Sequence, residues 1–432
     1  MQLTPPRGTR DFFPDEMWVR NHIFGIWRET ALSCGFEEYD SSILEHEELY
    51  VLKSGPEILE QLYNFVDKGG RGVALRPEMT PTLARMIASR GGALPKPIKW
   101  FSIAQCFRYE RMARGRKREH YQWNLDIVGV SEVTAEAELL AAALWCLERL
   151  GLGETDVVVR ISHRGLLGSV LKGLQVPEEA EPEVFRVIDK RGKEPDEGLC
   201  RQLENLGIPQ ATLKELFFLL DQKKIEVFSS FFEQRGVKTG AVRELETLFA
   251  LLQGYAVQEY CEFAPSIVRG LPYYTGIVFE CFDREARFRA LFGGGRYDKL
   301  LGLISGQDQP AVGLGFGDVV IQEILEASGC WKPPARAIDF FLVPFSEHER
   351  VAAVEILQHI RRQGASADLL LMPKKLKGAL RDAARVQSRA ALLLLPDELR
   401  EGILIVRNLE TGTETRMDKA DFLQNPRRVL GP

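Results

Sequence analysis

One basic segment with strand-like flanks constrains the fold of this chain more than any other feature. It reads FRYERMARGRKREHYQWNLDIVGV over residues 107–130. Arg108 and Glu110 alternate with aromatic residues, so on a strand their side chains share one face. Gly115 lies among the arginines, where glycine favours a turn. On a returning strand, three polar residues share one face: Gln122, Asn124 and Asp126. The pattern predicts an antiparallel hairpin with polar side chains on both strands.

The turn of this hairpin carries a dense cluster of one charge sign. Its members are Arg108, Arg111, Arg114, Arg116, Lys117 and Arg118. Such a cluster repels itself unless it is exposed or paired with an anion, which makes it a candidate phosphate site. The alternative is a solvated surface loop, and the polar residues on both flanking strands argue against it. The net charge of −5 does not exclude a nucleic-acid partner, because binding depends on the local field of a patch.

The pattern along the 432 residues indicates two or three domains, the first of them α+β. A helix is expected from Pro14 to about Ser33. Leu, Glu, Lys and Gln dominate residues 165–253, which predicts a helical insertion. Further strands and a helix are expected at the following ranges: 72–75, 98–103, 124–130, 156–162, 266–282 and 312–321 for strands, with a helix over 135–150.

The last hundred residues alternate strand-like and helix-like runs after a linker that contains Pro333 and Pro334. Strands are expected at 338–343, 367–371, 390–395 and 402–407, and helices at 347–363 and 376–387. The first of these helices is expected to present Val351, Val354, Leu357 and Ile360 on one side. The alternation predicts a small, mostly parallel α/β domain.

Several functional classes are excluded by what the sequence lacks. It contains no G-x-x-x-x-G-K-[ST] loop, and Gly313-x-Gly315-x-Gly317 is not the dinucleotide-binding G-x-G-x-x-G. Side chains must therefore neutralise the phosphates of any nucleotide. The seven cysteines include no C-x-x-C pair, so neither a disulfide framework nor a structural metal is expected. No apolar run approaches bilayer length and the N-terminus has no signal-like apolar region, so we expect a cytoplasmic protein with no membrane contact.

The stretches LRPEMTPTLARM (75–86) and IVRGLPYYTGIVFE (267–280), together with the basic hairpin, resemble the histidyl-tRNA synthetase family of class II aminoacyl-tRNA synthetases. The R-x-E and basic turn of the hairpin resemble motif 2. LRPEMTPTLARM (75–86) resembles the family's L-R-P-E-x-T turn, and IVRGLPYYTGIVFE (267–280) its R-G-L-x-Y-Y-T-G signature. GGGRYDKLL, PRGTRD and KKLKGALRDA fit the same family. The resemblance covers the whole chain, is weakest in the helical insertion, and is most specific in motif 2 together with the two-tyrosine signature.

This resemblance implies a fold and a domain layout. An antiparallel catalytic sheet would be built from residues 1–164 and 256–330, interrupted by a helical insertion over 165–255. A C-terminal α/β anticodon-binding domain would occupy 336–432. Motif 1 builds the dimer interface in this class, so the family implies a homodimer, although Ser41 and Ser42 stand where a proline is usual.

The resemblance also implies a histidine site. Glu78 and Thr80 would hold the substrate's ammonium with help from Gln122, a charge-assisted contact. Asp126 and Tyr274 would read the imidazole, which needs both a donor and an acceptor. The full implied set is Glu78, Thr80, Gln122, Asp126, Arg269, Tyr273, Tyr274 and Tyr297. Many bacterial relatives have Glu at the position of Asp126.

For ATP, the resemblance implies that Arg108 binds the α-phosphate and that Arg269 lies across this phosphate. These two are therefore the expected catalytic residues. Arg116 and Arg118 would reach the outer phosphates, and an aromatic ring at His120 or Tyr121 would hold the adenine. The expected ATP set is Arg108, Glu110, Arg116, Arg118, His120, Tyr121 and Gly315, with Mg²⁺ as part of the ATP complex. The motif 3 arginine that usually stacks on the adenine is absent, since Val320 stands in its place.

For tRNA(His), the expected contacts are Lys374, Lys375, Lys377 and Arg381; a plain solvated helix face is the alternative. A rival reading of the whole chain is a non-catalytic paralogue that regulates histidine biosynthesis. Such paralogues generally lack the anticodon domain and the catalytic arginine, whereas this chain keeps Arg269 and the α/β tail. A synthetase for another amino acid is disfavoured by Tyr273 and Tyr274.

Overall fold

The structure, a computed structural model, describes residues 3–192, 194–269, 273–329 and 337–430. The chain divides into two compact units, Met1–Lys332 and Pro333–Pro432, which are described separately. None of the helices in the described ranges is both long enough and apolar enough to cross a membrane.

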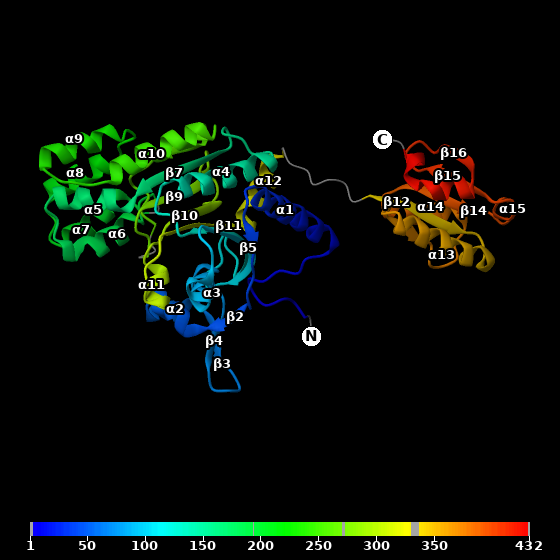
Figure 1. Cartoon of the computed structure of the whole chain (residues 1–432), viewed down its shortest axis with the longest axis horizontal. Helices are drawn as coiled ribbons and strands as arrows, with labels where there is room; N and C mark the ends of the chain where they lie inside the picture. The colour runs from blue at the N-terminus through cyan, green and yellow to red at the C-terminus, as the bar shows by residue number, and fades with distance from the viewer. Residues whose placement is uncertain (1–2, 193, 270–272, 330–336, 431–432) are drawn as a thin grey trace. The chain divides into compact units, whose positions relative to one another are not determined.

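An eight-stranded sheet forms the centre of the first unit (Figure 1). Only its two edge pairings are parallel and the other ladders are antiparallel, which confirms the predicted α+β class. In spatial order, the strands are β1 (Glu37–Glu38), β5 (Ile98–Phe107), β6 (Glu119–Val128), β11 (Ala311–Gly317), β10 (Phe292–Arg296), β9 (Ile277–Asp283), β7 (Val157–His163) and β8 (Cys261–Phe263).

The predicted hairpin is formed by β5 and β6, but its first strand ends at Phe107, before the arginines. Strand pairing runs from Ile98 opposite Val128 to Phe107 opposite Glu119. Residues 108–118 form the connecting loop, so the alternation expected for Arg108 and Glu110 on a strand is wrong. Gly115 does adopt a left-handed backbone, with φ of 69°, as the predicted turn requires.

Two other strand predictions were too long. The strand expected over 312–321 ends at Gly317, and helix α12 (Asp318–Ser328) begins there. Within the range 266–282 only β9 is a strand, while residues 270–272 lie outside the described residues. In both cases apolar β-branched residues suggested strand, although burial rather than backbone conformation explains their presence.

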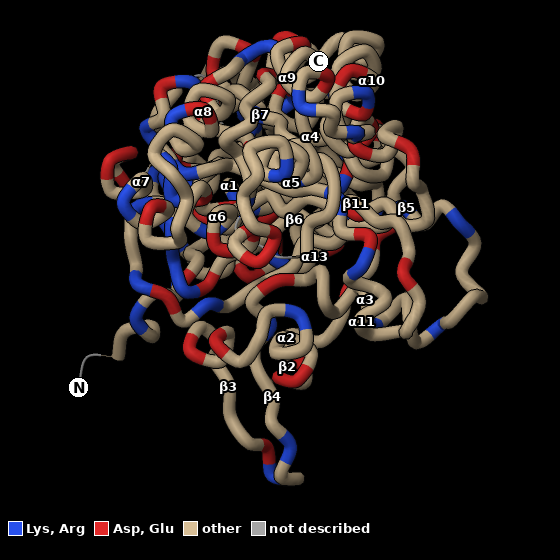
Figure 2. The backbone as a smooth tube through the Cα atoms, turned by 90° about the vertical axis from the view of Figure 1, so that its left-hand side faces the viewer, with Lys and Arg blue, Asp and Glu red and all other residues tan. Residues whose placement is uncertain are grey.

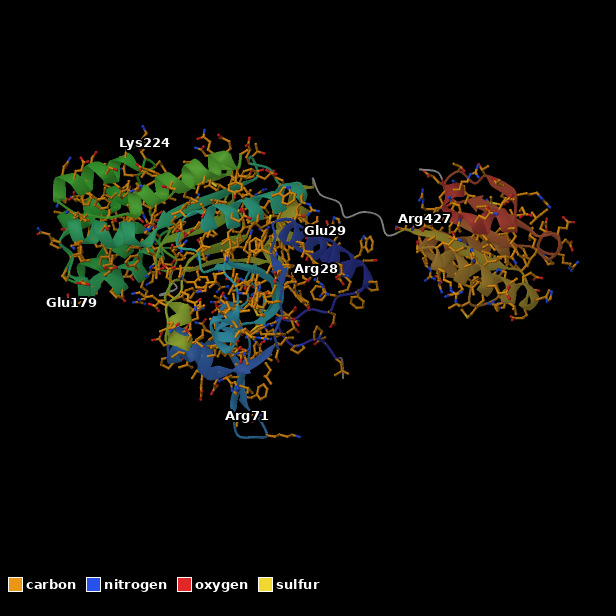
Figure 3. The ribbon with its side chains drawn as sticks, viewed as in Figure 1. Arg28, Glu29, Arg71, Glu179, Lys224 and Arg427 are labelled. Carbon is orange, nitrogen blue, oxygen red and sulfur yellow. The ribbon has the colours of Figure 1, made fainter. Side chains whose placement is uncertain are left out.

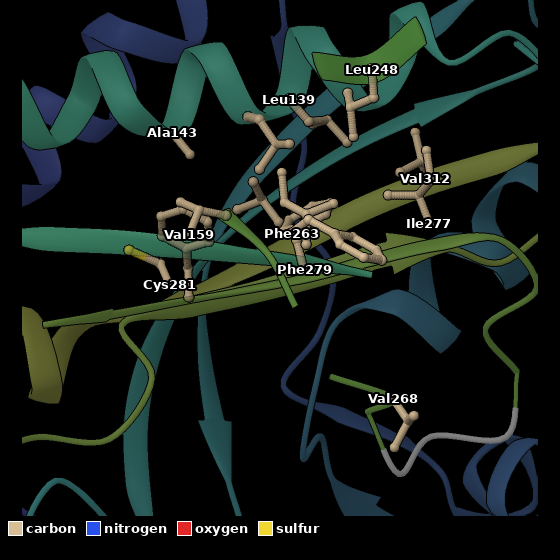
Figure 4. Packing of buried hydrophobic residues seen from close by; sticks show 14 of the residues in the cluster. Leu139, Ala143, Val159, Leu248, Phe263, Val268, Ile277, Phe279, Cys281 and Val312 are labelled. Atoms are coloured by element: carbon tan, nitrogen blue, oxygen red, sulfur yellow. The ribbon is translucent and has the colours of Figure 1, made fainter. Parts of the chain in front are cut away.

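The two faces of the large sheet are covered differently. Helices α1 (Pro14–Ser33) and α4 (Thr134–Arg149) cover one face, where Trp27 and Trp123 stack with ring centroids 5.9 Å apart. Figure 4 shows Leu139 of α4 above Val159 of the sheet. Helices α3 (Thr80–Arg90) and α11 (Leu300–Ser305) lie on the opposite side in Figure 1 and belong to a second apolar cluster.

A small three-stranded sheet stands beside the large one. It comprises β2 (Leu44–His46), β4 (Gly72–Leu75) and β3 (Tyr63–Val66) in that order, and α2 (Glu47–Ser54) follows β2 in the chain. The β3–β4 hairpin projects away from the rest of the unit with charged residues at its tip (Figure 2). Arg71, labelled at this tip in Figure 3, forms an ion pair of 2.7 Å with Asp67.

The chain between β7 and β8 is helical, which confirms the helical insertion of the predicted fold. Its helices pack into a separate layer, drawn in green in Figure 1, and charged residues such as Glu179 and Lys224 lie on its outside (Figure 3). The helices are α5 (Arg164–Gly173), α6 (Glu181–Ile188), α7 (Asp196–Glu204), α8 (Gln210–Leu220), α9 (Glu226–Arg235) and α10 (Ala241–Gly254).

The second unit is a five-stranded α/β domain whose sheet is mixed rather than mostly parallel. Its order is β13-β12-β14-β15-β16, parallel over the first three strands and antiparallel over the last three. The strands are β12 (Ile338–Pro344), β13 (Ala367–Leu369), β14 (Ser388–Leu394), β15 (Ile403–Asn408) and β16 (Glu414–Asp418), the last one unpredicted. The helices are α13 (Glu347–Arg362), α14 (Leu376–Arg385), α15 (Pro396–Arg400) and α16 (Lys419–Gln424).

The buried side of α13 also differs from the prediction. Val351 and Val354 are 67% and 48% exposed, whereas Ala353 and Ile356 are buried. Leu357 and Ile360 are buried as expected. The helix thus turns a small alanine toward the sheet, where close packing leaves little room for a larger side chain.

Candidate active site

The floor of the candidate site is bare backbone from two neighbouring strands, β10 and β11. A Cβ on Gly293 would lie 1.9 Å from Nη1 of Arg269. A Cβ on Gly313 would lie 2.0 Å from Oδ1 of Asp126, and one on Gly315 would lie 1.9 Å from Nε2 of Gln122. Only glycine allows these three polar side chains to lie flat on the sheet. The glycine-rich strands therefore serve the site by close approach rather than by flexibility.

Strand β6 brings polar side chains to this floor as the alternation predicted. Three of its buried side-chain oxygens have no hydrogen-bond partner among the described residues: Oε1 of Gln122, Oδ1 of Asn124 and Oδ2 of Asp126. Buried polar atoms in folded proteins are nearly always satisfied, so a cluster of unsatisfied ones suits a polar ligand.

Asp126 is the most perturbed of these groups. Its Oδ1 accepts a hydrogen bond of 2.5 Å from the hydroxyl of Tyr297. Burial raises the pKa of the Asp126 carboxyl to about 7, and the Tyr297 hydrogen bond opposes the rise only in part. Burial and the neighbouring Asp126 raise the pKa of Tyr297 as well. At neutral pH this carboxyl is therefore poised between its acceptor form and its donor form.

A buried ion pair closes another side of the site. Nζ of Lys53 lies 2.5 Å from Oε1 of Glu78 and 4.1 Å from the ring centroid of Tyr273. Burial pushes the pKa of Glu78 upward, but the charges of Lys53, Arg108 and Arg269 outweigh it and leave that pKa below its usual value. Burial lowers the pKa of Lys53. Glu78 is thus an ionised carboxylate, and it precedes Thr80 at the start of α3.

Arg269 is held from several sides across the glycine floor. Its φ of 46° is left-handed, which is uncommon for a residue with a side chain and typical of constrained sites. Its Nη1 donates to the carbonyl of Phe279 at 3.3 Å, and its Nε lies 3.6 Å from Glu280. The guanidinium carbon stands 5.5 Å from the ring centroid of Tyr274. The rings of Tyr273 and Tyr274 are 4.7 Å apart, so the two-tyrosine signature packs beside this arginine.

The arginines of the 108–118 loop surround the outer end of the site. Arg108 donates from Nε to the carbonyl of Pro77 at 3.0 Å, next to Glu78. Arg116 pairs with Glu110 at 2.5 Å, and the Arg118 guanidinium lies 4.0 Å from the centroid of the Tyr109 ring. Glu110 thus holds Arg116 in place, and the Tyr109 ring holds Arg118.

The two aromatic candidates for the adenine are separated by the sheet. His120 falls on the same side of β6 as Gln122, and burial followed by Arg108, Arg10 and Arg116 lowers its pKa to about 3. Tyr121 lies on the other face, with its ring 5.2 Å from Phe24 of α1. Tyr121 is therefore not brought together with the other predicted residues, because successive strand residues point to opposite faces.

Val320, which stands where the motif 3 arginine is usual, lies buried against the turn of the loop. A Cβ on Gly115 would be 3.4 Å from Cγ2 of Val320. The first turn of α12 therefore offers the loop an apolar contact rather than a charge.

A cavity of about 620 Å³ opens on the outer side of the tyrosine pair rather than over Asp126. Lys53, Tyr273 and Tyr274 line it from the catalytic sheet side, and Arg164 and Phe185 line it from helices α5 and α6. The unsatisfied polar atoms of strand β6 mark the position of the candidate site better than this cavity does, because none of them lines it. The cavity gives the site an opening toward the helical layer.

The remaining predicted residues belong to the second unit. Lys374, Lys375, Lys377 and Arg381 are exposed at the start of α14. Lys374 forms an ion pair of 2.5 Å with Asp382, so its charge is partly compensated.

Two contacts were missed from the sequence. Lys53 reads as an ordinary surface lysine at the end of a helix, and nothing in its local pattern indicates its pairing with Glu78. Arg296 makes two contacts of 2.6 Å with the buried carboxylate of Glu136, which anchors the strand that leads to Tyr297. The G-R-Y-D motif that contains Arg296 can be recognised in the sequence. Its partner Glu136, 160 residues away, cannot be predicted from it.

Comparisons with known proteins agree with this geometry. The family model described as "Histidyl-tRNA synthetase" matches residues 8–317, and the one described as "Anticodon binding domain" matches residues 339–425. The chain is 40% identical to the chloroplastic/mitochondrial histidine–tRNA ligase of Arabidopsis thaliana, over 98% of this chain and 86% of that protein. It is also 40% identical to the histidine–tRNA ligase of Opitutus terrae, over 94% of each chain.

A solved structure shares the fold over the full length. The crystal structure of histidyl-tRNA synthetase from Nostoc sp. PCC 7120 superposes with a TM-score of 0.85, covering 99% of this chain and 100% of that one. Sequence identity in this pair is 21%, so the likeness speaks to the fold alone.

Proposed function

The chain belongs to the histidyl-tRNA synthetase family, and from that premise we propose which of its side chains recognise histidine and ATP. The chain is a ligase that charges tRNA with histidine. In the first step a carboxylate oxygen of histidine bonds to the α-phosphorus of ATP. The bond from that phosphorus to the bridging oxygen breaks, and its electron pair leaves with pyrophosphate. In the second step a ribose hydroxyl of tRNA displaces AMP and its proton is released.

The observation that carries the residue assignment is the buried polar pocket on the glycine floor. Asp126 and Tyr274 read the imidazole, and Tyr297 fixes the orientation of Asp126. An imidazole offers one donor and one acceptor, which a carboxyl with a pKa near 7 and a phenol can match. A pocket of buried, unpaired polar atoms rejects an apolar amino acid strongly.

The substrate's ammonium binds at Glu78, with Thr80 and Gln122 beside it. The ionised state of Glu78 supports this role. Lys53 already contacts one carboxylate oxygen, which leaves the other oxygen for the substrate. Tyr273 packs over Lys53 and completes this side of the site.

Arg108 and Arg269 bind the α-phosphate and the attacking carboxylate, where negative charge develops. Fixed guanidinium groups lower the barrier because they need no reorganisation when the charge moves. Arg116 and Arg118 contact the outer phosphates, while Glu110 and His120 hold the adenine over the strand that carries Gly315. Mg²⁺ enters with ATP as part of the substrate. The reaction needs no protein nucleophile.

The tRNA contacts and the assembly are also proposals. We assign residues 1–164 and 256–330 to the catalytic domain, 165–255 to an insertion and 336–432 to the anticodon domain. Lys374, Lys375, Lys377 and Arg381 contact tRNA(His) through its phosphates. A homodimer and a cytoplasmic location complete the proposal; light scattering of the purified protein tests the first, and imaging of a tagged chain tests the second.

ATP–pyrophosphate exchange screened over all twenty amino acids tests the function. Exchange with histidine alone is the expected result. Exchange with another amino acid would overturn the specificity of the pocket, and no exchange at all would favour the non-catalytic regulatory role. Asp126→Ala adds a test of the residue assignment, because it should raise the KM for histidine far more than the KM for ATP. Equal increases in both would contradict the imidazole contact.

A further inference from the structure

The loop between β9 and β10, residues 284–291, packs against the turn of the arginine loop. The guanidinium carbon of Arg114 lies 4.7 Å from the centroid of the Phe288 ring. The next residue, Arg289, continues this contact, because a Cβ on Gly115 would lie 3.5 Å from its Cδ. The same point is 3.4 Å from Val320. Arg289 and Val320 therefore meet the Gly115 turn at one place, from two different segments of the chain.

The charge of Arg289 has no partner among the described residues. Its side chain is exposed and makes no hydrogen bond or ion pair with any residue in the part of the chain that the structure describes. Arg287, two residues earlier, has carboxylate partners: it lies 2.9 Å from Glu285 and 3.6 Å from Asp283. Arg284 donates to the carbonyls of Glu154 and Glu259. Arg289 alone of these three directs its side chain to the arginine loop instead of to an acceptor.

Positive charge exceeds negative charge around the turn. Arg116 has Glu110 at 2.5 Å, and Arg114 has Glu323 at 3.8 Å. Within the described ranges of the chain, Arg289 has no carboxylate partner. Burial lowers the pKa of Arg116, and the nearby Arg289 and Arg108 lower it further despite Glu110. Cations held this close repel one another, and an anion with several charges relieves that repulsion.

We propose that Arg289 binds the outer phosphates of ATP together with Arg116. This inference rests on the proposed function and extends it by one residue, from a segment outside the motifs quoted from the sequence. The triphosphate is the anion that the reaction brings to this loop, and the pyrophosphate that leaves carries the charge away from the α-phosphorus. Val320 at the same turn supplies packing but no charge, so the cation comes from the β9–β10 loop.

Arg289→Ala tests the proposal, with Arg287→Ala as its matched control. Both changes remove one exposed arginine from the same loop and alter the net charge equally. Arg289→Ala should raise the KM for ATP about tenfold, the loss expected for one charge-assisted contact. It should raise the KM for pyrophosphate in the reverse reaction to a similar extent and leave the KM for histidine unchanged. Arg287→Ala should change each value by less than about twofold. Arg289→Lys keeps the charge, so its KM for ATP should lie between those of the wild type and Arg289→Ala.

The outcomes separate this inference from the proposed function. A wild-type protein without histidine-dependent exchange would remove the function on which the inference rests. An active wild type with an unchanged ATP KM in Arg289→Ala would overturn the inference and leave the function standing. A raised ATP KM with an unchanged pyrophosphate KM would overturn it too, since Arg289 would then contact the adenosine end. Equal thermal melting of the three variants shows that none of these results comes from misfolding.

Discussion

The two halves of one hairpin, strand β6 and the loop over residues 108–118, hold their polar groups in opposite surroundings. Strand β6 presents buried polar atoms that have no partner among the described residues, and glycines of β11 lie directly beneath them. The loop over residues 108–118 presents arginines that are largely exposed and already share carboxylates such as Glu110. The polar atoms of the strand are thus removed from solvent, whereas the charges of the loop remain in contact with it.

The difference predicts how each half responds to change. In a desolvated pocket a lost contact leaves a buried group unpaired, so the effects are large and nearly independent of salt. In the exposed loop water replaces a lost contact, so the effects are small and screened by salt. Under the proposed assignment, specificity for the amino acid should depend on the strand, and attraction of the nucleotide should depend on the loop.

The largest expected effect comes from Arg269, which lies across the dry floor. Arg269→Ala should lower the rate of histidine-dependent pyrophosphate exchange about a thousandfold, because a fixed cation at the developing charge is lost. Single-turnover adenylate formation measures this directly. Near-normal exchange would show that Arg269 is not at the reacting atoms and would erase the contrast with the loop.

Adjacent glycines sharpen the contrast within a single strand. The three atoms nearest to a Cβ on Gly293 all belong to the guanidinium of Arg269, whereas a Cβ on Gly294 meets the carbonyl oxygen of Gly313 at 2.2 Å. Gly293→Ala should therefore fold normally and lose about a hundredfold in exchange rate through a misplaced arginine. Gly294→Ala should lower the free energy of unfolding by about 3 kcal/mol, because the backbone of the neighbouring strand must move to make room for the methyl group. Thermal melting with exchange assays measures both.

Gly317 provides the control for this pair, since a Cβ there meets nothing within 4 Å. Gly317→Ala should leave both melting and exchange unchanged. If Gly293→Ala melted as early as Gly294→Ala, the glycines would be required for the sheet and not for the site.

Much of this arrangement could be predicted from the sequence. The shared face of Gln122 and Asp126 follows from strand alternation, and the turn of the hairpin follows from the glycine among the arginines. The same alternation places His120 with Gln122 and excludes Tyr121, a signal that was present but not used. Val351 and Val354 show the limit of pattern reading, because two helix faces fit equally well and packing selected the one with Ala353.

The rest could not be predicted because it depends on contacts between distant segments. Lys53 meets Glu78 only when α2 and α3 pack together, and Glu136 meets Arg296 across 160 residues. Neither partner carries a local pattern that marks it. Burial decides these pairs, because a charge removed from water must find a counter-charge wherever the fold supplies one.

A smaller effect should appear in the pH dependence of folding. The folded protein holds the Asp126 proton up to about pH 7, whereas the ordinary pKa of this group is 3.8. Because the folded pKa is the raised one, the stability linked to this proton is complete below pH 3.8 and is lost as the pH rises through 7. Because asparagine cannot ionise, the stability advantage of Asp126→Asn over the wild type should grow between pH 3.8 and about 7 and stay constant above that pH. Urea unfolding at several pH values measures the difference; a difference independent of pH would contradict the desolvation of the pocket.

The smallest expected effect lies in the loop. Arg116→Ala removes an exposed guanidinium that already shares Glu110, so the KM for ATP should rise only about fivefold at low salt. In about 0.5 M salt the difference should shrink to about twofold, because salt screens the interactions of charges that are exposed to solvent. Asp126→Ala, assayed for histidine in the same buffers, should show no such shrinkage. A rise in the KM for ATP of Arg116→Ala that does not depend on salt would mean that the loop closes over ATP and excludes water. The strand and the loop would then respond alike once substrate is bound.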